Sequence, residues 1–215
     1  MTGGSGCNSP TGISFVEPFD YPGLVQRIGI YGGSFDPVHL GHLLVTRAAL
    51  EELQLDRLFL VPAAVSPFKP DRTPAPAAFR LQMLRLALAG STDCEVDEQE
   101  IQRGGISYTI DTLRQYARRF PTARLYYLIG ADHVSKLPEW HRAGELAQLA
   151  QFVVVPRPGE GSAPFPAPFH GVHLRGFPLA VSSSQIRARR QRGQPVDFLL
   201  PPAVAEVVRN NRLYL

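Results

Sequence analysis

At 215 residues the chain has the length of a single domain, and its 44% hydrophobic and 19% charged residues are ordinary for a globular protein. The formal net charge of +3 is compatible with an anionic ligand but is too small to predict a surface for nucleic acid. Lys69 and Lys136 are the only lysines among the 22 basic residues, so arginine carries nearly all of the positive charge.

Two cysteines, Cys7 and Cys94, predict neither a disulfide framework nor a zinc site. No apolar run in the sequence is close to the length of about 18 residues that a membrane-spanning helix needs. The N-terminus also lacks the basic and apolar segments of a secretory signal. We therefore expect a cytoplasmic protein that binds no membrane and no nucleic acid. The sequence does not determine the oligomeric state, and a homo-oligomer is one of the possibilities.

Residues 1–24 are dominated by Gly, Ser, Pro and Thr, a composition that predicts a flexible N-terminal tail. A mis-assigned start codon would give the same composition. The remaining residues, 25–215, are expected to form one domain.

Strand and helix patterns alternate along this domain. In the first half, the predicted elements are a strand at 26–32 that ends in a glycine pair, a helix at 40–54, a strand at 56–62, a proline-rich loop at 63–77, a helix at 78–90 and an extended segment at 94–101. In the second half, they are a helix at 107–120 that Ser107 or Thr109 can cap, a strand at 123–130, a helix at 144–151, a strand at 152–156, a loop at 159–171, a short strand at 172–177, and helices at 182–193 and 201–215.

This alternation predicts an α/β fold: a Rossmann-like, doubly wound parallel sheet with flanking helices and a small C-terminal helical segment. Such sheets bind ligands beyond the carboxyl ends of their strands. We therefore expect the functional site among the loops that follow Tyr31, Pro62, Ile129 and Val155.

The loop after the first strand reads GGSFDPVHLGH and predicts a phosphate site. Gly32 and Gly33 allow a tight turn and close approach to a ligand, and Pro37 fixes the backbone ahead of the helix. His39 and His42 are three residues apart, so they project from neighbouring positions on the first helical turn. Free N–H groups and the positive dipole end of a helix attract anions, and two imidazoles complete a cradle for phosphate.

Other interpretations of this loop fit less well. It has neither the Lys-Ser/Thr of a Walker loop nor the GxGxxG spacing of a dinucleotide site. A zinc site would need ligands beyond the two histidines, and nothing nearby supplies them. The histidines can also serve only in packing, an alternative that the surrounding glycines and proline disfavour.

The stretch GGSFDPVHLGHL resembles the signature of a nucleotidyltransferase superfamily whose hallmark is His-x-Gly-His or Thr-x-Gly-His. Four further motifs follow in order: SYTIDTL, LIGADHVSKLPEWH, VVVPRPG and VSSSQIR. Together the motifs resemble the bacterial nicotinate-nucleotide adenylyltransferase family, over about Arg27 to Leu215. The resemblance implies transfer of AMP from ATP to nicotinate mononucleotide, which yields nicotinate adenine dinucleotide and pyrophosphate. Nicotinamide mononucleotide or phosphopantetheine as the acceptor, and a catalytically silent nucleotide-binding protein, remain as alternatives.

The resemblance also implies site residues. His39, His42 and Arg187 would be catalytic, with a divalent ion, expected to be Mg²⁺, on the ATP phosphates and no metal site built from side chains. The implied ATP-binding residues are Gly32, Gly33, Ser34, Phe35, His39, His42, Gly130, Asp132, Ser183, Ser184 and Arg187. The implied residues for the nicotinate nucleotide are Lys69, Thr109, Trp140, His141 and Arg157.

Simpler roles compete with several of these assignments. Thr109 can merely cap a helix, and a lone tryptophan is more often part of a core, although the loop position of Trp140 favours stacking on a ligand. Lys69 and Arg157 lie in loops on the expected ligand side, where a solvated charge is equally consistent with the sequence.

Two further points concern the motifs themselves. Ser182 and Gln185 have the spacing of a capping box, which is compatible with phosphate binding at the same helix start. In the segment Ser66-Pro67-Phe68-Lys69, Phe68 stands where relatives often have histidine. This departure puts in doubt any polar role at that position.

Overall fold

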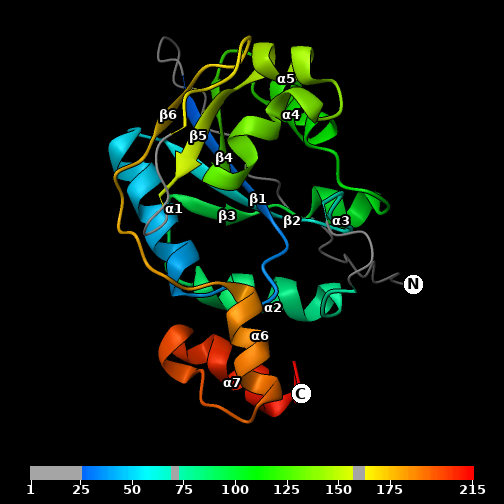
Figure 1. Ribbon diagram of the computed structural model, residues 1–215, viewed down its shortest axis with the longest axis vertical. Helices are drawn as coiled ribbons and strands as arrows, with labels where there is room; N and C mark the ends of the chain where they lie inside the picture. Colours follow the sequence, from blue (N-terminus) through cyan, green and yellow to red (C-terminus); the bar gives the residue numbers. More distant parts are fainter. Residues whose placement is uncertain (1–25, 69–72, 157–162) are drawn as a thin grey trace, which may run out of the picture.

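The computed structural model describes residues 26–68, 73–156 and 163–215. The predicted tail at 1–24, Lys69 and Arg157 lie outside the described residues. Within them, a parallel sheet of six strands forms the centre of the protein (Figure 1). In spatial order the strands are β3 (Cys94–Val96), β2 (Arg57–Pro62), β1 (Arg27–Gly33), β4 (Arg124–Gly130), β5 (Gln151–Val155) and β6 (Gly171–His173).

The chain order reverses direction between β1 and β4. From β1 the chain proceeds outward through β2 to β3, and then returns to place β4 on the other side of β1. All the pairings are parallel, and the Cα of Tyr31 in β1 is paired with that of Leu128 in β4. The loops that follow these two strands therefore open at the same edge of the sheet, which is where ligands bind in doubly wound folds. The predicted fold class is confirmed.

Helices cover both faces of the sheet. One apolar cluster contains residues of α1 (Leu40–Glu52), α2 (Ala77–Ala87), α6 (Ser183–Gln191) and α7 (Pro202–Asn210). The other contains residues of α4 (Thr109–Arg119), η1 (Ala131–Glu139) and α5 (Ala143–Leu149). In Figure 1, α6 and α7 form the lower end of the molecule, beside the C-terminus.

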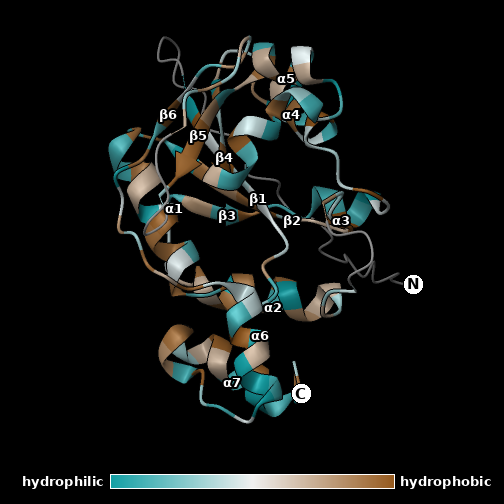
Figure 2. Ribbon diagram, viewed as in Figure 1, coloured by the Kyte–Doolittle hydropathy of each residue, from teal (hydrophilic) through white to brown (hydrophobic). Residues whose placement is uncertain are grey.

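The strands supply both clusters because successive side chains point to opposite faces. In β2, Leu58 and Leu60 join one cluster, while Phe59 and Val61 join the other. In Figure 2, β5 is largely hydrophobic, whereas the outer helices carry both hydrophilic and hydrophobic segments. Among the described residues, no helix is long and apolar enough to cross a membrane.

The prediction for residues 94–101 was wrong in its second half. Only Cys94–Val96 is a strand, and the helix α3 (Gln99–Arg103) follows it. The carboxylate of Asp97 accepts a hydrogen bond from the backbone N–H of Gln99 at 3.0 Å, which turns the chain at this point. The short helix buries Gln99 and Glu100, and polar residues at those positions gave no apolar periodicity to read.

The predicted caps of α4 were also wrong. Tyr108 occupies the N-cap position and no side chain caps the helix. The Ser107 hydroxyl instead accepts a hydrogen bond from the backbone N–H of Ala64 at 2.9 Å. The Thr109 hydroxyl donates to the Tyr127 hydroxyl at 3.2 Å. Both polar side chains thus connect α4 to neighbouring strands and loops. The 3-10 helices η1 and η2 (Asp197–Leu199) were not predicted.

Gly29 in β1 is a glycine at which added volume would press directly on the core. A Cβ there would lie 2.5 Å from Leu55 Cδ1 and 3.1 Å from Leu58 Cγ, both in the core. We expect Gly29→Ala to lower the free energy of unfolding by ~1–3 kcal/mol through overpacking.

Gly144→Ala is the matched control, because no heavy atom lies within 4 Å of a Cβ at that position of α5. It should leave the free energy of unfolding unchanged or raise it by up to ~1 kcal/mol. Urea denaturation of both variants measures the difference. Equal stability of Gly29→Ala and wild type would contradict the packing at β1.

Candidate active site

A cavity of about 810 Å³ lies at the carboxyl ends of β1 and β4, where the strand order reverses. The loops after these strands line it, together with the start of α4, η1 and the start of α6. The structure therefore brings together most of the residues that the sequence pointed to. The predicted residues that line the cavity are Gly32, Gly33, Ser34, Phe35, His39, His42, Thr109, Gly130, Asp132, Trp140, Ser183, Ser184 and Arg187.

The two histidines of the glycine turn lie against each other at the start of α1. His39 is the N-cap residue, and its ring stacks on that of His42 with centroids 3.7 Å apart and planes inclined by 29°. The backbone N–H of His39 donates to Nδ1 of His42 at 3.1 Å. Because Nδ1 accepts this bond, the ring hydrogen of neutral His42 resides on Nε2. Nε2 of His42 is therefore a hydrogen-bond donor.

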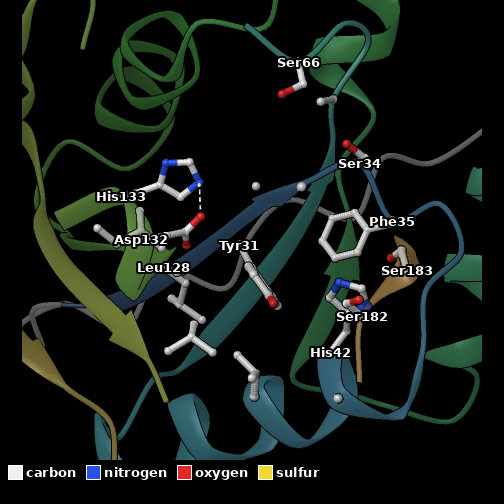
Figure 3. A pocket seen from close by; sticks show the side chains of 18 of the residues that line it. Tyr31, Ser34, Phe35, His42, Ser66, Leu128, Asp132, His133, Ser182 and Ser183 are labelled. Carbon is white, nitrogen blue, oxygen red and sulfur yellow. Dashed lines mark ion pairs between the residues drawn. The ribbon is translucent and has the colours of Figure 1, made fainter. Parts of the chain in front are cut away.

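Phe35 packs behind this pair. It is buried, and its ring centroid lies 5.0 Å from that of His42 and 5.5 Å from that of Tyr31. Its φ of 46° is in the left-handed region, a backbone strain of the kind that is concentrated at functional sites. Figure 3 shows Phe35 and His42 close together on one side of the pocket and Asp132 with His133 across from them.

Gly41 lies between the two histidines, and close packing at this position leaves no room for a side chain. A Cβ at this position would lie 2.8 Å from Cγ1 of Val181 and 3.1 Å from the His39 ring. The absence of a side chain therefore lets the start of α1 approach the segment that leads into α6. Two helix N-termini consequently meet at one end of the cavity.

The start of α6 forms the predicted capping box. The Ser182 hydroxyl accepts from the backbone N–H of Gln185 at 3.2 Å, and the Gln185 side chain accepts from the backbone N–H of Ser182 at 2.9 Å. The Ser183 hydroxyl donates to the carbonyl oxygen of Pro37 at 2.9 Å, which ties α6 to the glycine turn. With Arg187 one turn further along α6, this end of the cavity combines dipoles and charge suited to phosphate.

Aromatic side chains line the opposite end of the cavity. Trp140 lies with its ring centroid 5.3 Å from that of Phe68 and 5.7 Å from that of His133. Its Nε1 is buried and has no hydrogen-bond partner among the described residues. Trp140 therefore lines the cavity and also packs in an aromatic cluster. Its role as a platform for a ligand ring stays a prediction.

The wall beside Trp140 contains hydroxyl and carboxyl groups. Tyr127, Thr109, Ser107 and Glu100 all line the cavity there. Glu100 is buried and accepts a hydrogen bond from the Thr112 hydroxyl at 2.5 Å. Burial raises the pKa of Glu100, and burial also raises that of Tyr127.

Among the residues that line this end, Glu100, Tyr127, His133 and Lys136 were not identified from the sequence, and Ser107 was considered only as a helix cap. His133 and Lys136 lie within the GADHVSKLPEWH motif, so their proximity to Trp140 was the available signal. Glu100 and Tyr127 reach the cavity only through tertiary packing. His141, by contrast, is exposed and is not among the residues that line the cavity. Its ring centroid lies 4.8 Å from that of Tyr108, so the geometry gives no support to a binding role.

Metal ligation by side chains alone finds no support in residues 26–68, 73–156 and 163–215. No group there of three or more histidine, cysteine, aspartate or glutamate side chains is placed to hold a metal ion. Cys94 is buried, and burial raises its pKa to about 12, so its thiol stays protonated at neutral pH.

Known proteins are similar in sequence to this chain over most of its length. The model of the cytidylyltransferase-like family matches residues 30–189. A probable nicotinate-nucleotide adenylyltransferase of Opitutus terrae is 40% identical over 196 residues, which cover 88% of this chain and 98% of the relative. The chain belongs to the nicotinate-nucleotide adenylyltransferase family, among the cytidylyltransferase-like proteins. The nicotinate-nucleotide adenylyltransferase of Bacillus subtilis is 37% identical over 191 residues, or 88% of this chain and 99% of that one.

Solved structures support the fold of this family member. The nicotinic acid mononucleotide adenylyltransferase of Plasmodium falciparum, complexed with NaAD, superposes with a TM-score of 0.70 at 18% identity. The superposition covers 88% of this chain and 97% of the other. At this identity the likeness establishes the architecture, and the roles of individual residues rest on the geometry above.

The raised pKa of Glu100 has a consequence for stability. Between its ordinary value of 4.5 and its raised folded value, the folded protein binds more protons than the unfolded chain. The free energy of unfolding therefore falls as pH rises through this window. We expect Glu100→Gln, which cannot ionise, to reduce that fall.

Urea denaturation at a series of pH values from 4.5 to neutrality measures the effect. Glu206→Gln, at an exposed position of α7, is the control and should follow the wild-type profile. Parallel profiles for wild type and Glu100→Gln would show that burial of this carboxyl does not govern the pH dependence.

Proposed function

We propose that this protein transfers AMP from ATP to nicotinate mononucleotide, using the stacked histidines of α1 and Arg187 of α6 at one end of the cavity and the aromatic cluster at the other. The observation that carries the proposal is the meeting of two helix N-termini, paired imidazoles and an arginine at the edge of the sheet. Membership of the nicotinate-nucleotide adenylyltransferase family supports both the reaction and the acceptor.

The reaction is an in-line displacement at phosphorus. A phosphate oxygen of nicotinate mononucleotide attacks the α-phosphorus of ATP and forms the new O–P bond. The bond from the α-phosphorus to the bridging oxygen breaks, and its electron pair leaves with pyrophosphate. The attacking phosphate is already ionised at neutral pH, so no general base is required.

Catalysis then consists of positioning and of stabilising negative charge. His42 donates from Nε2 because its Nδ1 already accepts the backbone N–H of His39. The stacked ring of His39 lies beside it, and Arg187 adds a guanidinium group whose side chain is 17% exposed. Contacts within the protein hold His42 and Arg187 in position, so little reorganisation is needed as charge develops.

A divalent ion would bind at this site through the phosphates of ATP and not through a set of protein side chains. No cluster of side chains in the described residues forms a cage for a metal, whereas Mg²⁺ commonly binds through substrate phosphates and water. We propose Mg²⁺, which would neutralise charge on the triphosphate. The protein contributes the helix N-termini and the histidine pair that orient this triphosphate.

The acceptor is assigned to the end with Trp140 and Thr109. A flat pyridine ring suits the face of Trp140, and the hydroxyl of Thr109 lies on the neighbouring wall. The ring of Phe68 packs beside Trp140 at this end. Lys69 and Arg157, outside the described residues, remain predicted partners for the carboxylate or phosphate of the acceptor.

The acceptor is tested by pyrophosphate release from ATP with nicotinate mononucleotide and nicotinamide mononucleotide offered separately. We expect a higher kcat/KM with the nicotinate nucleotide, because a site built for a carboxylate loses charged hydrogen bonds with the amide. A preference for the nicotinamide nucleotide would overturn the acceptor. The absence of turnover with both nucleotides and with phosphopantetheine would favour a protein that only binds nucleotides.

The histidine pair is tested by His42→Ala. We expect kcat to fall at least ~100-fold, as removal of one transition-state donor often does, with a smaller change in KM for ATP. The control is His173→Ala, on β6 and outside the cavity lining, which should retain the wild-type kcat. A His42→Ala enzyme with near-wild-type kcat would remove this imidazole from the mechanism.

A further inference from the structure

Asp36, in the glycine turn, is a buried carboxylate for which the reaction above has no use. Its exposed fraction is 1%, and it follows the strained residue Phe35. Its Oδ1 accepts hydrogen bonds from the Tyr214 hydroxyl at 2.8 Å and from the backbone N–H of Ala75 at 3.1 Å. A buried carboxylate with two donors on one oxygen has a fixed orientation.

The same residue also holds the catalytic arginine. Nη1 of Arg187 donates to the backbone carbonyl oxygen of Asp36 at 2.7 Å and lies 3.9 Å from its Oδ2. Arg187 therefore contacts Asp36 through both the main chain and the carboxylate. The oxygen bound by Tyr214 and the oxygen nearest Arg187 belong to one planar group, so rotation of the carboxylate would move both contacts together.

Tyr214 is far from the glycine turn in the sequence and reaches it from the end of the described chain. The backbone N–H of Leu213 donates to the carbonyl oxygen of Val208, which folds this segment back on α7. Tyr214 is partly buried against the core cluster of α1, α2 and α7. Burial and the neighbouring Asp36 raise the pKa of Tyr214, so its hydroxyl remains a donor at neutral pH.

We propose that Tyr214 and Asp36 are positioning residues that hold the guanidinium of Arg187 at the phosphate end of the cavity. This inference rests on the catalytic role proposed for Arg187. Without the Tyr214 hydroxyl, the carboxylate of Asp36 has one donor fewer on Oδ1 and is freer to turn. Arg187 and the buried Arg80 are its two cationic neighbours, and Arg80 is held by hydrogen bonds to the carbonyl oxygens of Ser34, Ala63 and Ala75, so Arg187 is the neighbour able to move toward it. A closer pair between Asp36 and Arg187 draws the guanidinium away from the ligand phosphates.

A double-mutant cycle between Tyr214 and Arg187 tests the proposal, with kcat and the Kd of ATP as separate readouts. Tyr214→Phe retains the ring and removes only the hydroxyl. We expect it to lower kcat about tenfold in the wild-type background, since small displacements of a catalytic group carry large rate costs. In the Arg187→Ala background the same change should alter kcat less than about twofold, because the two residues act through one contact.

The Kd of ATP should follow the same pattern, rising about threefold on Tyr214→Phe in the wild-type background and remaining constant in the Arg187→Ala background. Tyr116→Phe is the matched control. Its hydroxyl also donates to a carboxylate, Asp97 Oδ2 at 2.6 Å, but it lies in the other core cluster and outside the cavity lining. Tyr116→Phe should change thermal stability while leaving kcat and Kd near the wild-type values.

The outcomes separate this proposal from the function on which it rests. An equal loss on Tyr214→Phe in both backgrounds, or no loss in either, would overturn the positioning role while leaving the enzyme active. If Arg187→Ala kept the wild-type kcat and Kd, the role of Arg187 and the positioning of its side chain would fall together. If no acceptor were turned over, the proposed function would fail, and the Kd cycle would still decide whether Tyr214 acts through Arg187.

Discussion

Parallel pairing of β1 with β4 is the constraint on which the site depends. The register that aligns Tyr31 with Leu128 puts the ends of both strands at one edge of the sheet. The glycine turn and η1 then face each other across a cavity instead of lying on opposite edges. Every later contact between the histidines, the aromatic cluster and α6 relies on this alignment, because no local sequence could bring β1 beside a strand about 100 residues away.

Charge at the phosphate end of the cavity is balanced rather than simply positive. Arg187 brings a guanidinium, and buried Asp36 places a carboxylate 3.9 Å from it. The contact with Asp36 offsets part of the positive charge that Arg187 brings and, in the positioning role proposed above, fixes where the guanidinium lies. Attraction for the triphosphate must then come largely from oriented N–H groups at the starts of α1 and α6 and from the imidazoles. Such groups are preorganised, which favours catalysis over simple tight binding.

The opposite end of the cavity differs from the phosphate end because aromatic side chains line it. Trp140, Phe68 and His133 present aromatic surfaces, and the buried Glu100, whose pKa is raised by burial, also lines the cavity. A wall that combines aromatic rings with hydroxyl and carboxyl groups selects a ligand by shape and by the hydrogen bonds that it permits. In the proposed function, one end of the cavity thus suits the charged phosphates of ATP, and the other suits the flat ring of the acceptor.

Local patterns were sufficient where one segment contains the whole feature. The spacing of His39 and His42 predicted that the two imidazoles lie together at the helix start, and the spacing of Ser182 and Gln185 predicted the capping box. They failed where a polar side chain bonds to a distant partner. Helix capping was one role that the sequence allowed for Thr109, but its hydroxyl bonds to Tyr127 of β4 because packing brings the two side chains together.

The sequence by itself therefore determined most of the succession of strands and helices, the family and the glycine turn with its paired histidines, because periodicity and turn chemistry act over a few residues. Tertiary structure alone decided which residues complete the site. The fold brings Glu100 and Tyr127 to the cavity and places Tyr214 against Asp36. Residues up to 178 positions apart in the sequence come into contact in this way. Burial then turns those encounters into hydrogen bonds, since a buried carboxylate or hydroxyl must find a partner wherever the fold supplies one.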